Sequence, residues 1–167
     1  MMGGEAKARK TMQAGSLAQA LEREHREIDG GIEEYTKALS EGDADPAPLV
    51  RATNGLRRHI YLEEEFLFPP LKANGLVMPI FVMLREHGEL WDAMDALGAL
   101  LASGADAATV QNACRELLAQ LDSHNSKEEP IIYPQADAVL DPDAAARLHE
   151  FLDEGRMPEG WRCEKAA

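Results

Sequence analysis

The stretch HIYLEEEFLFP, residues 59–69, recurs in the second half of the chain as HNSKEEPIIYP, residues 124–134. Each copy places a glutamate four residues after a histidine and ends in an aromatic residue and a proline. A shorter pair, EHREI at 24–28 and EHGEL at 86–90, precedes the two copies in the same order. Residues four apart share one face of a helix, so each HxxxE unit can direct both side chains to one point. The pattern indicates a duplicated helical hairpin packed on itself.

Apolar residues at steps of three and four continue this helical pattern through most of the chain. They predict long helices at about 16–40, 48–73, 79–102 and 106–132, and Ser16 is a plausible N-cap for the first. Short loops between them favour antiparallel packing. We therefore expect an all-α fold, an up-and-down antiparallel four-helix bundle with a short C-terminal helix over 141–153. The expected domain boundaries are a mobile tail at 1–15, the bundle at 16–154 and an irregular tail at 155–167.

Polar residues occupy positions on the apolar stripes where leucine is expected. Every long helix turns one histidine inward, and two helices also turn a glutamate inward one turn later. The six residues are His25, His59, Glu63, His87, His124 and Glu128. Burying them without partners would cost roughly 1–3 kcal/mol for each group, a cost that a bound metal removes. Imidazole and carboxylate ligands suit iron, manganese or zinc, and the two-half pattern favours two metals bridged by the glutamates.

Composition excludes several other classes of protein. The 167 residues carry a formal net charge of −13, which argues against nucleic-acid and anionic membrane partners. No run of about 18 apolar residues predicts a spanning helix, and residues 1–13 lack the apolar core of a signal peptide. Cys114, predicted to be buried, and Cys163, predicted to lie in the tail, form no CxxC pair. We expect a cytoplasmic protein, and the sequence indicates no oligomeric state.

The order His, HxxxE, His, HxxxE resembles that of hemerythrin-like (HHE cation-binding) domains, over about residues 17–134. The resemblance implies a non-haem di-iron centre with an oxo or hydroxo bridge, for which zinc or manganese can substitute. The resemblance also implies that the same six residues are the metal ligands. The set is closest to the iron–sulfur-repair (RIC) type, whose N-terminal cysteine-pair domain this chain lacks. A ferritin-like site needs two ExxH motifs, and only Glu22 and His25 have that spacing.

The expected function is to bind or respond to oxygen, nitric oxide or peroxide, rather than to act as a dedicated enzyme. A di-iron enzyme that consumes nitric oxide or peroxide, and a protein that stores or donates iron, remain alternatives. Oxygen carriers of the family place a further histidine where this chain has Trp91, which we expect to pack over the site. Two such halves predict a nearly symmetric centre with an open position on each iron. We therefore expect air to oxidise the reduced protein to a stable diferric form.

Other polar residues lie near these motifs. Asp29 either orients a ligand histidine or is a solvated helix charge. Tyr133 is able to donate to a metal-bound ligand, although packing is the favoured interpretation, and Glu64 and Glu129 are expected to be surface charges. His149, on the short fifth helix, is expected to lie at the surface, outside the metal site.

Overall fold

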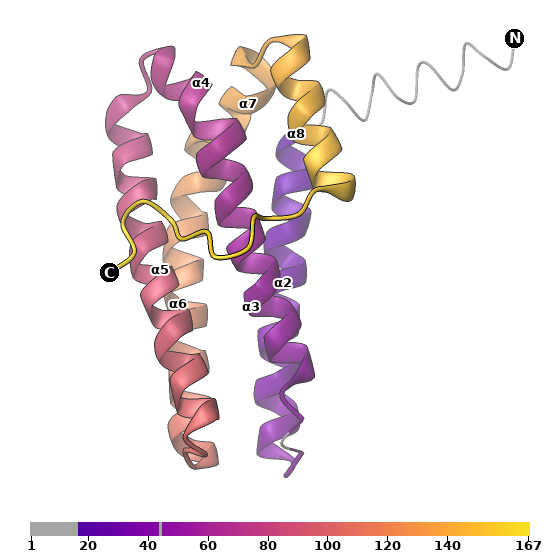
Figure 1. Ribbon diagram of the computed structural model, residues 1–167, viewed down its shortest axis with the longest axis vertical. Coiled ribbons are helices and arrows are strands. Elements are labelled where there is room, and N and C mark those ends of the chain that lie inside the picture. Colours follow the sequence, from indigo (N-terminus) through magenta and orange to yellow (C-terminus); the bar gives the residue numbers. More distant parts are fainter. Residues whose placement is uncertain (1–16, 44) are drawn as a thin grey trace, which may run out of the picture.

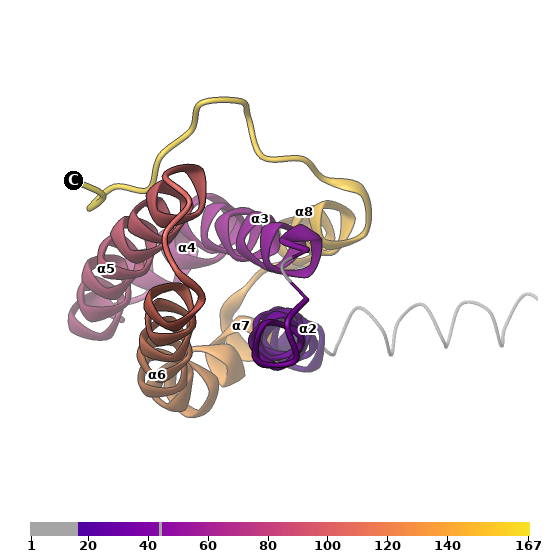
Figure 2. The ribbon, with the colours of Figure 1, turned by 90° about the horizontal axis from the view of Figure 1, so that it is seen from below.

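Four long helical segments form a bundle in the computed structural model, which describes residues 17–43 and 45–167 (Figures 1 and 2). The segments are α2 (Leu17–Ser40), α3 (Ala47–Leu62) with its continuation, α5 (Val77–Ala102) and α6 (Ala107–Ile131). The end-on view places them at the corners of a square (Figure 2). The predicted all-helical bundle with a short C-terminal helix, α8 (Pro142–Glu154), is confirmed. Residues 1–15 and Ser16 lie outside the described part of the chain.

Helix boundaries follow local signals in the sequence. Asp106 caps α6 by accepting a hydrogen bond from the backbone N–H of Thr109 at 2.8 Å. Asp141 caps α8 in the same way, through the N–H of Ala144 at 2.8 Å. Such caps satisfy N–H groups that the first turn of a helix leaves without partners.

Prolines disturb both HxxxE helices just after the glutamate. A five-residue π-helical turn, η1 (Glu63–Leu67), follows α3, and the N–H of Phe68 bonds to the carbonyl of Glu63. The helix then resumes as α4 (Phe68–Ala73), with Pro69 and Pro70 in its first turn. In the second copy, α6 contains Pro130 and ends at Ile131, and α7 (Tyr133–Val139) follows. A proline lacks an N–H and crowds the preceding turn, so the chain widens or breaks there.

The apolar core has two parts, one on each side of a buried polar layer. One part includes Ile32, Leu56, Trp91 and Leu117, and lies toward the 41–46 and 103–106 loops. The other includes Leu21 and lies toward α4, α7 and α8. The six inward-facing polar residues occupy the layer between them. No helix in the described part of the chain has the length and hydropathy needed to span a bilayer.

The C-terminal segment, residues 155–167, runs across α3 and α5 (Figure 1). It is irregular, as predicted, but it is packed rather than detached. Arg58 donates to the carbonyls of Phe151, Leu152 and Gly155 where this segment begins. Trp161 packs edge-on against Trp91, with ring centroids 5.5 Å apart.

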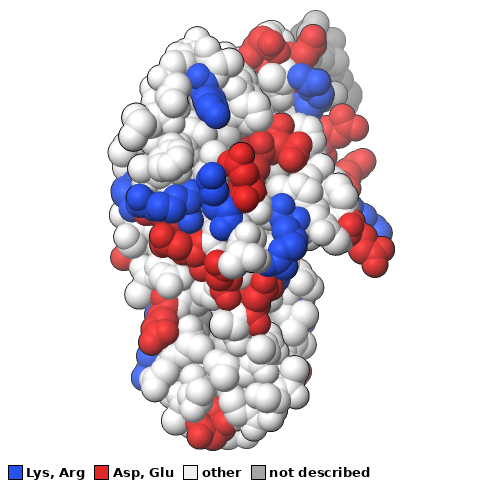
Figure 3. All heavy atoms as spheres, turned by 60° about the vertical axis from the view of Figure 1, so that its left-hand side comes forward, with Lys and Arg blue, Asp and Glu red and all other residues white. Residues whose placement is uncertain are grey.

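Cys163, expected to be a tail residue, is 4% exposed. Its thiol and that of Cys114 are both free. On the face that Figure 3 shows, side chains of both charges gather in a band across the middle, between two ends that carry few charges.

Candidate metal centre

All six candidate ligands meet in the polar layer of the bundle. Each is at most 4% exposed, and each long helical segment contributes at least one of them. They form two groups, in each of which the ligand atoms lie within 4.8 Å of one another. The His25 group is His25, His59, Glu63 and Glu128, and the His87 group is Glu63, His87, His124 and Glu128. His149 belongs to neither group.

Both glutamates lie between the two groups. Glu63 Oε2 is 3.4 Å from His59 Nε2, while its Oε1 is 3.1 Å from His87 Nε2. Glu128 Oε1 is 3.1 Å from His25 Nε2, and its Oε2 is 3.2 Å from His124 Nε2. Each carboxylate therefore presents one oxygen to each group. This is the arrangement needed for two carboxylates to bridge two cations.

Three buried atoms of the His87 group have no hydrogen-bond partner among the described residues. They are Glu63 Oε1, His87 Nε2 and Glu128 Oε2. Buried polar atoms without partners are costly, and here all three converge on one point. A cation at that point would satisfy them together. The mixture of imidazole nitrogen and carboxylate oxygen suits iron, manganese or zinc, so the residues present fit a metal.

Each of the four histidines uses its other ring nitrogen to bond to a second carboxylate. The pairs, with Nδ1–oxygen distances, are His25–Glu129 (2.9 Å), His59–Glu24 (2.8 Å), His87–Glu64 (2.8 Å) and His124–Glu86 (2.9 Å). With the proton on Nδ1 donated to the carboxylate, Nε2 directs its lone pair to the centre. Such contacts fix the ring and raise its basicity as a ligand.

These contacts correct one expectation from the sequence and decide against one of the two alternatives for Asp29. Glu64 and Glu129 hydrogen-bond to the candidate ligands His87 and His25, so they are not merely surface charges. Asp29 does not take that role: its Oδ1 is buried with no partner in the described structure, and burial raises the pKa of its carboxyl group to about 6. The carboxylate that holds His25 comes instead from the opposite half of the chain.

The electrostatics of the layer favour positive charge at its centre. Burial alone would lower the pKa of His59, but the charge of Glu63 and hydrogen bonds to two glutamates raise it to about 10. Burial would likewise lower the pKa of His124, but the charge of Glu128 and hydrogen bonds to Glu128 and Glu86 raise it to about 9. Burial would raise the pKa of Glu128, yet the surrounding histidines hold it well below its usual range. Protons or a metal cation can supply the positive charge that these carboxylates attract.

Tyr133 also belongs to the centre, which the sequence analysis missed. Its hydroxyl oxygen lies 2.7 Å from His25 Nε2, 2.9 Å from His59 Nε2 and 2.8 Å from one oxygen each of Glu63 and Glu128. These are the four members of the His25 group. In a regular α-helix, a residue five positions after a ligand would point about 140° away from it. The break in the helix after Ile131 instead turns the phenol toward the layer.

Trp91 packs beside the layer, as expected. It is 2% exposed, lies against Trp161, and has the Arg57 guanidinium 4.9 Å from its ring centroid.

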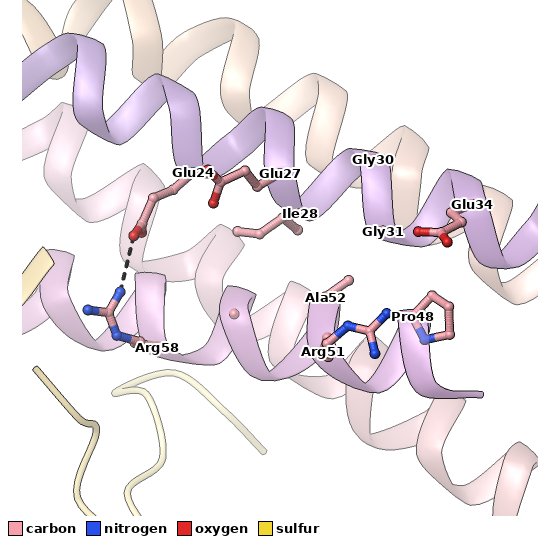
Figure 4. A pocket seen from close by; sticks show the side chains of 11 residues that line it. Glu24, Glu27, Ile28, Gly30, Gly31, Glu34, Pro48, Arg51, Ala52 and Arg58 are labelled. Carbon is pink, nitrogen blue, oxygen red and sulfur yellow. Dashed lines mark hydrogen bonds and ion pairs between the residues drawn. The ribbon is translucent and has the colours of Figure 1, made fainter. Parts of the chain in front are cut away.

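A surface groove of about 500 Å³ lies between α2 and α3 (Figure 4). The small residues Gly31 of α2 and Ala52 of α3 both line it, and Glu24 and Arg58 form an ion pair at one end. Glu24 is also the residue that holds His59. The groove therefore brings solvent close to one of the carboxylates that orient the centre.

Comparison with known proteins gives one match. The hemerythrin HHE cation-binding domain matches residues 16–136, a range that contains all six candidate ligands and Tyr133. No curated protein and no solved structure matches the chain.

Proposed function

The chain belongs to the hemerythrin HHE cation-binding family, and from that premise we propose that it is a di-iron protein that binds or responds to oxygen, nitric oxide or peroxide. In this proposal His25 and His59 bind one iron, His87 and His124 bind the other, and Glu63 and Glu128 bridge them. Zinc or manganese can occupy the same positions.

One observation carries the proposal of two metals rather than one. Each glutamate has one oxygen within 3.4 Å of a histidine nitrogen of the His25 group and the other within 3.2 Å of one in the His87 group. A single ion would leave half of these contacts unused. Two ions would use both oxygens of both carboxylates, together with all four imidazoles.

The bound irons supply redox-active positions for a small ligand. The residues of the chain hold those positions and limit access to them. Leu62, Leu67 and Ile132 are at most 1% exposed in the apolar core beside the layer, which excludes bulk water and favours a small, weakly polar ligand.

The first experiment measures stoichiometry. Full-length protein is loaded with ferrous iron without air, desalted and analysed for metal. We expect about two irons per chain, since the proposed ligands form two groups. One iron or none per chain would refute the shared centre.

The second experiment tests the small ligand. Reduced, iron-loaded protein is titrated with nitric oxide and, separately, with oxygen, and its spectrum is followed. We expect nitric oxide to bind and oxygen to leave a stable diferric protein. An oxygenated spectrum that reverts fully when the solution is flushed with inert gas would make the protein an oxygen carrier instead. Turnover of peroxide or nitric oxide would favour an enzyme, and transfer of iron to an acceptor would favour a donor.

We also propose a cytoplasmic location. Both cysteines carry free thiols, which favours a reducing compartment.

A further inference from the structure

The hydroxyl of Tyr133 has more acceptors around it than one phenol can satisfy. Four atoms lie within 2.9 Å of its oxygen, two of them carboxylate oxygens and two of them imidazole nitrogens. A phenol has one proton to donate. The side chain is fully buried, so water cannot supply the missing donors. A cation bound among these atoms would satisfy all four, and the phenol oxygen is within 2.9 Å of each of them.

The equivalent position in the other half of the chain holds no oxygen. Phe68 follows Glu63 by five residues, as Tyr133 follows Glu128, and each comes directly after a disturbed helical turn. The Phe68 ring stacks on His87, with centroids 5.3 Å apart and planes 22° apart. The His87 group therefore has a hydrocarbon ring where the His25 group has a hydroxyl.

Within the two groups, the polar atoms without hydrogen-bond partners lie on the side of Phe68, not on the side of the Tyr133 hydroxyl. Glu63 Oε1, Glu128 Oε2 and His87 Nε2 lack hydrogen-bond partners, and all three face the His87 group. The other oxygens of the same two glutamates, which face the His25 group, both lie 2.8 Å from the Tyr133 hydroxyl oxygen. Two groups with matching histidines and glutamates thus differ in one oxygen atom.

We propose that Tyr133 is an oxygen ligand of the metal in the His25 group, and that the two metal positions are consequently unequal. The phenol proton leaves to solvent as the metal binds, and the phenolate oxygen takes a coordination position. The metal in the His87 group, beside Phe68, has no such donor and is the one that accepts a small ligand. This inference rests on the proposed di-iron function and corrects the expectation of a nearly symmetric centre.

A phenolate has a direct consequence for oxidation state. Its negative charge stabilises ferric over ferrous iron, because the more highly charged ion gains more from a nearby anion. The His25 position should therefore have the lower reduction potential of the two. We therefore attribute the expected stability of the oxidised centre in air to the phenolate at one metal position, and not to two equally open irons.

The test uses the visible spectrum of oxidised, iron-loaded protein. Ferric iron bound by a phenolate gives a charge-transfer absorption, and excitation into that band enhances tyrosinate ring vibrations in the Raman spectrum. The chain has three tyrosines, so the double variant Tyr35→Phe/Tyr61→Phe leaves Tyr133 as the only tyrosine. We expect this variant and the unmodified protein to show the same tyrosinate signature. The measurement leaves the centre itself unaltered.

Tyr133→Phe provides the complementary variant. It should lose the signature, keep two irons per chain and show a higher midpoint potential than the unmodified protein. Tyr61→Phe is the matched control, because Tyr61 packs against Phe66 and Trp161 outside the centre. Unmodified protein that binds two irons but shows no tyrosinate signature would overturn the proposal and leave the di-iron function intact. Protein that binds fewer than two irons would contradict the di-iron function itself.

Discussion

Stripping the metal from the protein should lower its melting temperature by roughly 6–12 °C. The magnitude follows from Glu63 Oε1, His87 Nε2 and Glu128 Oε2, the three buried atoms of the His87 group that have no hydrogen-bond partner. At the low end of the usual cost, about 1 kcal/mol each, they destabilise the metal-free protein by about 3 kcal/mol. A domain of this size changes its melting temperature by roughly 2–4 °C per kcal/mol. This difference appears in the melting temperature because the metal binds the folded state and not the unfolded one.

The assay is scanning calorimetry of iron-loaded protein and of the same sample after chelation. Glu63→Gln should lose most of the metal-dependent shift, since an amide cannot replace a carboxylate that faces both groups. Glu89→Gln is the matched control on the surface, where the glutamate side chain is 61% exposed. Equal melting temperatures for loaded and chelated protein, with two irons confirmed in the loaded sample, would refute the reasoning about unpartnered atoms.

Three further outcomes are expected. Glu128→Ala should lower the iron content of the protein to less than half, whereas His149→Ala should leave it unchanged. Elemental analysis measures both, and a greater loss of iron in His149→Ala than in Glu128→Ala would contradict the ligand assignment. Glu24→Ala should weaken iron binding about 10–100-fold in a competition assay with a chelator, because His59 loses the carboxylate that orients it. Gly88→Ala should loosen the C-terminal segment, because a Cβ at this position would lie 2.5 Å from the Lys165 carbonyl oxygen. Gly98→Ala is the control, because a Cβ there would meet nothing within 4 Å. Limited proteolysis measures the difference, and equal cleavage of the two variants would show that the close approach of Gly88 to Lys165 is unimportant.

The helices were predictable because their signals are local. Apolar spacing and caps such as Asp106 and Asp141 depend only on neighbouring residues. The inward histidines and glutamates were predictable for the same reason, because each lies on an apolar stripe of its own helix. Their convergence in one layer followed from the order in which the two halves repeat.

The contacts between helices were not predictable in this way. His59 bonds to Glu24 and His87 bonds to Glu64, and each of these pairs joins two different helical segments. Which glutamate reaches which histidine depends on how the helices are rotated and offset against one another, and sequence spacing does not contain that information. The position of Cys163 was missed because irregular chain has no periodicity from which burial can be inferred.

Tyr133 was missed for a different reason. Side-chain directions inferred from residue spacing assume a regular helix, but prolines follow the glutamate of each HxxxE unit. The π-helical turn Glu63–Leu67 and the break at Ile132 change those directions. A disturbed turn after a ligand is therefore a reason to examine the residue that follows it, even when helical geometry places that residue elsewhere.

The doubled hairpin also bears on how such a centre can evolve. Two identical hairpins that dimerised about a twofold axis would have to carry the same residue at equivalent positions, so a tyrosine beside one metal would require a tyrosine beside the other. Joining the hairpins in one chain removes that constraint, because a mutation then affects one side only. Phe68 and Tyr133 are an instance of this freedom. Joining the two hairpins in one chain therefore allows each of the two ligand groups to change separately, which no homodimer of the same hairpin permits.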